Sequence, residues 1–445
     1  MRRRLLLAAL VALAIPGCGG EEPSASGAAD VALLPAEIAT LDGLFATNCA
    51  GCHREGGPAP FALLDARDRR RRARQIAEVV GSRYMPPWLP DRDLEPLVGA
   101  RGLDEDEIAL VERWARTGAP GADLAPPAGE GDLGPPDLVL EAAGPIAIPA
   151  EGAGIQHTLV YRPDLAAPRD LRALAYRPGN PGALHGGGLL LDASGGARRL
   201  DERSPEAGYR SPGGMGYSLV GSLDAFSPGA RPQPWPDDAT PRLAPGETIS
   251  LELHLNPRGR LEEERGALRV WFAPPGPRDE VVPLAIGSLC IDIPPGARDY
   301  RVEDEIELDR DVRLVGLFPM ARYVCQEVTL RVTPPGGTPR TVFRIRDFDL
   351  NWVQRYQFAA PIVLPAGSRI AMEMVYDNSR ANPQNPRAAP ERVRAGMRAI
   401  DEAGFVILHL AAATADDAAA LRRRHEDGFR LRLERRRAWE AQRPR

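Results

Sequence analysis

The sequence predicts a multidomain fold: a small all-α domain followed by two antiparallel β-sandwich domains. Within residues 104–117, Ile108, Val111 and Trp114 recur at helical spacing. Residues 119–136 are rich in Pro and Gly and have no apolar period, which is typical of a linker. Beyond them, short apolar runs alternate with Pro and Gly breaks, which is typical of antiparallel sandwiches.

The N-terminal end has the pattern of a bacterial lipoprotein. Arginines at positions 2–4 precede an apolar run over residues 5–15 that is too short to span a bilayer. Residues 15–18 (IPGC) resemble a lipobox, which predicts lipid modification of Cys18, export and anchoring to the cell envelope. Cleavage after a small residue, without lipid, is the alternative. The predicted segments are a lipoprotein signal peptide over residues 1–18 and a flexible tether over residues 19–36.

Residues 49–53 read Cys-Ala-Gly-Cys-His, the C-x-x-C-H pattern at which haem is attached covalently to c-type cytochromes. The chain has only 5 Cys and 6 His among 445 residues, so this pattern rarely arises by chance. The alternatives are a disulfide and half of a zinc site, but no second C-x-x-C is present to complete a zinc site. We therefore predict haem c, bound through Cys49, Cys52 and His53.

A methionine downstream fits the sixth position on the iron. Met85 precedes Pro86 and Pro87, which remove backbone donors and stiffen the loop. A thioether opposite an imidazole raises the reduction potential and favours electron transfer. Core packing is the alternative role for this methionine. With an Arg-rich helical stretch over residues 66–80, residues 37–120 form the predicted cytochrome c domain and residues 121–136 the linker that follows.

The overall charge argues against nucleic acid as a partner. The formal net charge is −5, and the basic residues are all arginine, since the sequence contains no lysine. Together with 45 Gly and 45 Pro, this indicates a coding bias and not a selected arginine surface. The run Arg69 to Arg72 is therefore predicted to be a solvated helix face.

Residues 137–412 are too many for one sandwich, and the break PPGPRDE near residues 275–280 divides them. We predict an N-terminal sandwich over residues 137–278, a C-terminal sandwich over residues 279–412 and an Arg-rich helical tail over residues 413–445. The alternating or apolar runs that predict strands are residues 189–191, 249–255, 267–272, 312–317 and 405–410.

Two further cysteines lie in this region. Cys290 and Cys325 would face an oxidising compartment after export, so a disulfide between them is predicted. Two free buried thiols are the alternative.

Motifs in the β region stand in a specific order. They are Arg177-Pro178-Gly179-Asn180 with Leu184, His185 and Asp192; Ser227-Pro228-Gly229 with Leu251-Glu252-Leu253-His254 and Gly259; and Asp347-Phe348, Asn351-Trp352, Tyr356, Tyr376-Asp377-Asn378-Ser379, Asn382-Pro383 and Asn385-Pro386. This order resembles the copper type II, ascorbate-dependent monooxygenases, the family of peptidylglycine hydroxylating and dopamine β-monooxygenases. It is most similar to bacterial members fused behind a cytochrome c domain. The resemblance covers most of residues 37–412 and implies that both sandwiches are jelly rolls.

The copper sites that the resemblance implies are incomplete. At the first site His185 and His254 match the family's histidines, but Gly186 stands where the second member of the histidine pair is expected. At the second site Met320, Arg322 and Ala403 take the ligand positions. Arginine has only donors and cannot bind a cation, so the resemblance implies that this site is lost.

A residual copper at the first site would be held by His185 and His254, with help from Met215 or a backbone group. The alternative is a structural role for both histidines. His157, His409 and His425 have no partner at ligand spacing and are predicted to be ordinary strand or tail residues.

The predicted function is single-electron transfer by an exported cytochrome to or from a redox partner protein. The sandwich pair would be a docking module that has lost hydroxylase activity. One alternative is an active copper-dependent oxidoreductase fed by the haem. Another is a structural envelope protein. No nucleophile elbow, nucleotide-binding loop or dinucleotide fingerprint is found in the sequence.

Overall fold

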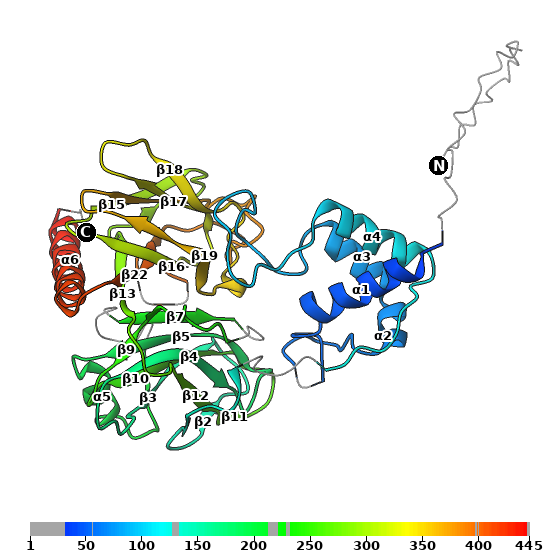
Figure 1. Cartoon of the computed structure of the whole chain (residues 1–445), viewed down its shortest axis with the longest axis horizontal. Helices are drawn as coiled ribbons and strands as arrows, with labels where there is room; N and C mark the ends of the chain where they lie inside the picture. The colour runs from blue at the N-terminus through cyan, green and yellow to red at the C-terminus, as the bar shows by residue number, and fades with distance from the viewer. Residues whose placement is uncertain are drawn as a thin grey trace, which may run out of the picture.

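The structure, a computed structural model, describes residues 32–55, 57–126, 133–211, 221–227, 232–396, 398 and 400–442. A helical part near the N-terminus lies beside two β parts, and a long helix near the C-terminus lies against the second of them (Figure 1). The prediction of a β-rich, multidomain chain is confirmed. Within the described residues, no helix combines the length and the apolar character needed to cross a bilayer.

The helical part contains α1 (Pro35–Asn48), α2 (Ala66–Arg71), α3 (Ala73–Gly81) and α4 (Glu105–Arg116). The predicted final helix is confirmed: the Asp104 side chain accepts from the backbone of Glu107, and the Glu107 side chain accepts from the backbone of Asp104. The stretch over residues 66–80, predicted as one helix, is two helices, because Arg72 leaves helical geometry at φ −110° and ψ 8°.

The linker begins as part of the helical fold. The backbone N–H of Ala122 donates to Asp42, Asp123 accepts from the Ala66 N–H, and Leu124 N–H donates to the Leu64 carbonyl at 2.8 Å. On the far side of residues 127–132, Leu133 is buried beside Trp271. Both described ends of the linker are therefore held by side-chain or backbone contacts.

The first β part is built from two main sheets over one apolar core. One sheet has the order β1-β12-β4-β9: β1 (Leu138–Glu141), β12 (Ala267–Phe272), β4 (Arg169–Arg177) and β9 (Arg242–Leu243). The other has the order β6-β3-β10-β5-β7: β6 (Tyr209–Arg210), β3 (Ile155–Tyr161), β10 (Thr248–Leu255), β5 (Leu184–Asp192) and β7 (Ser222–Phe226). The pair β2 (Ile146–Ile148) and β11 (Glu262–Glu264) and the short helix α5 (Gly196–Asp201) complete it.

The second β part also has two main sheets over one core. One has the order β19-β16-β22-β13-β8: β19 (Tyr356–Leu364), β16 (Val312–Met320), β22 (Phe405–Ala412), β13 (Asp279–Gly287) and β8 (Ala239–Thr240). The other has the order β15-β20-β17-β18: β15 (Tyr300–Glu307), β20 (Arg369–Tyr376), β17 (Cys325–Thr333) and β18 (Arg340–Ile345). The pair β14 (Asp292–Ile293) and β21 (Val393–Arg394) and the turn η2 (Leu350–Trp352) are additions.

The sheet that contains β22 is buried on both faces. Val406, Leu408 and Leu410 face the core of their own β part, whereas Phe405 and Ile407 pack with Ala225 of β7. A strand covered on both sides carries a continuous apolar run instead of an alternating one. This explains the unbroken run over residues 405–410, and all of the strands predicted from apolar runs are confirmed.

The predicted C-terminal helix is present as α6 (Ala415–Ala441), and the Thr414 side chain caps it by accepting from Asp417 N–H. Most of α6 is exposed, but Leu421 and His425 are buried against the β13 side of the second β part. His425 lies in the predicted tail helix, where it is a buried core residue. Its burial follows from its place one helical turn after Leu421.

Candidate functional site

One cavity of about 420 Å³ gathers the residues predicted to bind haem. Cys49, Cys52, His53 and Met85 all line it. The motif follows the end of α1, where the His53 N–H donates to the Cys49 carbonyl at 2.9 Å and forms a helical turn. Met85 approaches from the loop after α3, and its N–H donates to the Val79 carbonyl. The cavity has the size of a cofactor pocket.

His53 is oriented by a neighbouring backbone group. Its Nδ1 lies 3.1 Å from the Phe61 carbonyl, and the two rings lie 4.9 Å apart. Because a carbonyl only accepts, Nδ1 carries the proton and Nε2 keeps a free lone pair. Burial lowers the pKa of His53 below its ordinary value, which also favours the neutral imidazole that a metal requires.

The two thiols of the motif are not joined in a disulfide. Cys49 is half-buried, yet desolvation raises the pKa of its thiol to about 12, with a further contribution from Cys52. A thiol with so high a pKa is a poor nucleophile and a poor candidate for redox exchange.

The prediction that Arg69 to Arg72 form a solvated helix face is wrong for Arg69. Its side chain is almost fully buried and donates to the carbonyls of Leu63 and Leu64 at 2.8 and 2.9 Å, with an ion pair to Asp42 at 3.1 Å. These carbonyls lie in a loop beside the motif, and that of Leu64 also accepts from the Leu124 N–H. Arg72 stacks over Phe61 at 3.9 Å and so supports the carbonyl-bearing residue that orients His53.

The cavity is closed by residues far away in the sequence. Arg101, His185, Asn351 and Trp352 line it together with the motif. They come from the loop before α4, from β5 and from η2. Asn351 and Trp352 belong to the motifs of the sequence resemblance, but no sequence signal assigned them to this cavity. Only the tertiary structure brings the three parts of the chain together here.

His185 and His254 lie near one another on β5 and β10. The β5–β10 register shifts between the pairs Leu184–Leu255 and Gly186–His254, so His185 sits in a bulge. Burial, followed by an electrostatic contribution of His254, lowers the pKa of His185, and its Nε2 is buried without a hydrogen-bond partner. The two imidazoles offer a metal at most two ligands.

In the part of the chain that the structure describes, no complete metal site surrounds His185 and His254. His254 Nε2 lies 3.6 Å from the Glu252 carboxylate. Among the residues described, no group of three His, Cys, Asp or Glu side chains is arranged to hold a metal ion. Met215, the further ligand considered from sequence, lies outside the described residues.

The residues at the second predicted copper position make structural contacts. Met320 is half-buried and packs with Phe318 and Phe405 at the end of β16. The Arg322 backbone N–H donates to Glu402, and its guanidinium donates to the Arg398 carbonyl. The Ala403 carbonyl accepts from the Tyr376 hydroxyl at 2.7 Å. These contacts tie the loop before β22 to the sandwich core.

Other motifs of the sequence resemblance also have structural roles. The N–H groups of Gly179 and Asn180 donate to the buried Glu264 carboxylate at 2.9 and 2.7 Å. Asp192 accepts from the Ala197 N–H at the start of α5. Asn378 is fully buried, and its side-chain amide donates to three backbone carbonyls. Such residues fix turns and do not reach the cavity.

Two cysteine predictions have different outcomes. Cys290 and Cys325 are free in the structure, so the predicted disulfide is not formed there. Cys325 is fully buried in the second β part, and its Sγ lies 3.6 Å from the Glu327 carbonyl, to which the thiol donates. The buried thiol thus has a partner of its own. Cys18 and the signal peptide over residues 1–18 lie outside the described residues.

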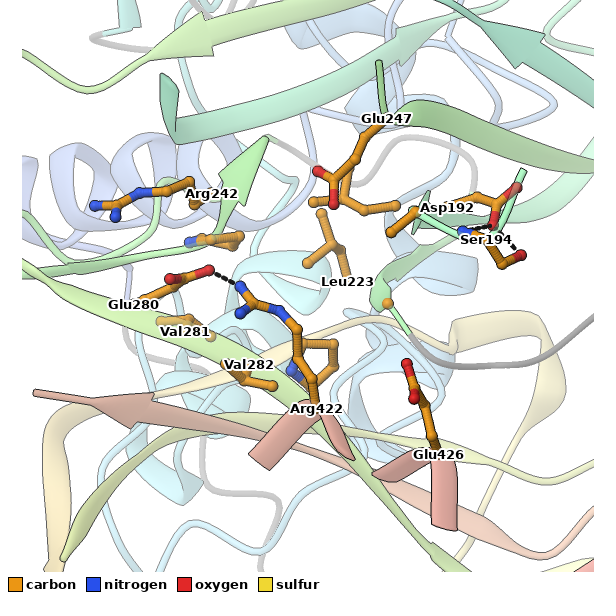
Figure 2. Close-up of a pocket in the computed structure, with 15 residues that line it drawn as sticks. Asp192, Ser194, Leu223, Arg242, Glu247, Glu280, Val281, Val282, Arg422 and Glu426 are labelled. Atoms are coloured by element: carbon orange, nitrogen blue, oxygen red, sulfur yellow. Dashed lines mark hydrogen bonds and ion pairs between the residues drawn. The ribbon is translucent and has the colours of Figure 1, made fainter. Parts of the chain in front are cut away.

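A second cavity of about 230 Å³ lies where β13 and α6 meet the first β part. Figure 2 shows Glu247, Arg422 and Glu426 projecting toward it. Two of its charged groups already have structural partners: Arg422 donates to Glu280, and Glu247 accepts from the Ala244 N–H at 2.7 Å. We assign it no ligand.

Comparison with known proteins identifies no family. No protein-family model matches the chain, and no curated protein matches it. A structure of the Gt strain of infectious bursal disease virus is 14% identical over 62% of this chain and 72% of the viral chain, with a TM-score of 0.15. The tandem CBM22 domains of Xyn10C from Paenibacillus barcinonensis are 10% identical over 61% and 83%, also with a TM-score of 0.15. Neither similarity supports an argument about fold or function.

Proposed function

We propose that this chain is an exported c-type cytochrome that transfers single electrons between its haem and a redox partner protein. The observation that carries the proposal is the single cavity lined by Cys49, Cys52, His53 and Met85. Residues 37–120 would then be an all-α cytochrome c domain, since Leu63, Ile76 and Val80 of their buried apolar core line this cavity.

Each of these residues has a distinct role toward the haem. Cys49 and Cys52 would bond to its vinyl groups, and His53 Nε2 would face the iron while Nδ1 remains bonded to the Phe61 carbonyl. Met85 would supply the opposite ligand. The haem, when bound, supplies a reversible one-electron centre whose potential a thioether ligand raises. Ile76 and Val80 on α3 line the cavity and exclude water from it.

The test is to mature the full chain with haem and measure covalent haem as the pyridine haemochrome. We expect haem that resists acid-acetone extraction, and a near-infrared sulfur-to-iron band in the oxidised protein. Met85→Ala should remove this band and lower the potential, whereas Met320→Ala, which lies outside the cavity, should keep both. Lack of covalent haem in the parent protein would contradict the proposal.

The sandwich pair is proposed to be a docking module derived from a copper monooxygenase that no longer hydroxylates substrates.

A second candidate function, an oxidoreductase in which the haem supplies electrons to copper, is favoured by one observation. His185, a histidine of the first predicted copper site, lines the same cavity as Cys49, Cys52, His53 and Met85. A copper titration separates the two: we expect at most one copper per chain and no ascorbate-driven oxygen uptake. Two tightly bound coppers would favour the second candidate.

Export and lipid anchoring are proposed from the segment that ends at Cys18. Cys18→Ser should release the protein from the membrane fraction, because the proposed anchor is the lipid on this residue. Retention of the variant in membranes, measured by fractionation and immunoblot, would point to another anchor.

A further inference from the structure

The loop of residues 86–101, here called the docking loop, leaves the helical part and runs along the second β part (Figure 1). It directly follows Met85 and reaches the edge strands of both sheets, β18 and β19. Edge strands expose unpaired backbone groups, so a loop that pairs with them becomes part of the sheet. The docking loop is therefore fixed to the sandwich and not only to the helices.

On β18, the anchor is Asp91. The preceding residue, Pro90, forms an antiparallel bridge with Ile345, and Asp91 N–H donates to the Arg344 carbonyl at 2.8 Å. The Asp91 carboxylate accepts from Arg344 Nε at 2.5 Å and lies 3.0 Å from Arg346 Nη2. Its side chain is 14% exposed. Burial raises the pKa of Asp91, but the hydrogen bonds from Arg346 and Arg344 outweigh this and lower it below the ordinary value.

On β19, the loop pairs through its backbone. Val98 N–H donates to the Gln357 carbonyl and Ala359 N–H donates to the Pro96 carbonyl, both at 2.8 Å. Closer to Met85, the Trp88 ring meets Tyr356 edge to face at 5.8 Å. Trp88 packs against the core of the second β part. The segment from Met85 to Asp91 thus spans from the cavity to the sandwich.

We propose that Asp91 is a positioning residue for Met85, holding the methionine at the haem by fastening the docking loop to β18. The proposal rests on the proposed function, since it requires the haem. Pro86, Pro87 and Pro90 restrict the backbone between the two residues, so a displacement at Asp91 is passed on to Met85 instead of being absorbed. The second β part therefore decides how firmly the sixth ligand is held.

The test uses the full, haem-loaded chain and exogenous imidazole, which competes with Met85 for the iron without any change of oxidation state. Asp91→Ala should retain covalent haem, weaken the near-infrared sulfur-to-iron band and bind imidazole at least about tenfold more tightly than the parent. Arg346→Gln removes one partner of Asp91 at an exposed site, should fold normally, and should produce a smaller change in the same direction. Spectrophotometric titration of the ferric protein measures both.

The matched control is Glu307→Gln, which breaks the exposed Arg369–Glu307 ion pair elsewhere on the same β part. It should leave the band and the imidazole affinity as in the parent. Unchanged spectra and imidazole binding in both Asp91→Ala and Arg346→Gln, with covalent haem present, would overturn the positioning role and leave the proposed function standing. Absence of covalent haem in the parent, or a parent without the sulfur-to-iron band, would overturn the positioning role together with the ligand assignment on which it rests.

Discussion

Three histidines outside the cavity are buried. His157 Nε2 lies 2.7 Å from the Ala207 carbonyl, and His425 Nδ1 lies 2.9 Å from the Pro283 carbonyl, so each ring donates to a backbone acceptor. His409 lies between Trp235 and Phe318 where the two β parts meet. Burial is the main cause that lowers the pKa of all three. Each therefore resists protonation as long as the protein is folded.

His425 provides a pH test. Burial lowers its pKa to about 4 from an ordinary value of 6.5. A lowered folded-state pKa means that its stabilising contribution is complete above pH 6.5 and is lost as the pH falls through about 4. His425→Gln can still donate to Pro283 but does not titrate. Between these two pH values, the parent should lose up to about 3 kcal/mol more free energy of unfolding than the variant.

Urea unfolding at several pH values measures this difference. His254→Gln is a control, because the His254 side chain is partly exposed. The same pH dependence in parent and His425→Gln would show that this histidine does not contribute to acid sensitivity.

At the scale of single elements, β5 explains the Gly186-Gly187-Gly188 run. Gly187 pairs with Leu253 of β10 on one side and with Phe226 of β7 on the other. A Cβ on Gly187 would lie 2.6 Å from the Glu252 carbonyl oxygen and 2.6 Å from the Phe226 ring. At Gly186 the nearest atom, the Phe226 carbonyl oxygen, would be 3.1 Å away. Close approach of three strands therefore requires glycine at 187 and only favours it at 186.

Gly187→Ala should destabilise the protein by about 1–3 kcal/mol, since the added methyl must displace backbone as well as a ring. Gly186→Ala, one position earlier in the same strand, is the matched control and should cost less. The midpoint of urea unfolding, followed by far-UV circular dichroism, gives both values. Equal costs at the two positions would show that the backbone contact at Gly187 is not limiting.

At the scale of the whole molecule, a buried ion pair joins the two β parts. Arg355, just before β19, donates from Nε to Asp224 of β7 at 3.2 Å and from Nη1 to Gln357 at 2.8 Å. Its guanidinium also stacks on Trp235 at 3.8 Å. Nearby, the Ser227 hydroxyl donates to the Val353 carbonyl at 3.0 Å. The same short segment continues to Trp352, which lines the cavity beside Cys49 and Met85, so one segment contacts both this junction and the cavity.

Asp224→Asn should cost about 3–5 kcal/mol, because it leaves the buried guanidinium without its counter-charge. Asp427→Asn, which breaks an exposed pair with Arg430 on α6, should change the free energy of unfolding by no more than about 0.5 kcal/mol. Urea unfolding of both variants measures the difference. A similar small effect for both would mean that the junction between the β parts does not depend on this pair.

The sequence by itself determined the features that depend on neighbours along the chain. Helical spacing identified the helix that contains Val111 and Trp114. Apolar runs identified the strands, although they could not tell that β22 is covered on both faces. The motif over residues 49–53 predicts covalent attachment of haem, because this prediction depends only on the spacing of residues within one turn.

Only the tertiary structure decided which residues line the cavity opposite that motif and which contacts hold the loops around it. His185 and Trp352 reach the cavity from strands and turns far away in the sequence, and Asp91 meets Arg344 across the edge of a sheet. Arg69 is buried because loop carbonyls and Asp42 surround it, although its arginine neighbours predict exposure. Such contacts arise from the packing of separate elements. No local pattern of apolar or charged residues encodes them, because each depends on a partner far along the chain.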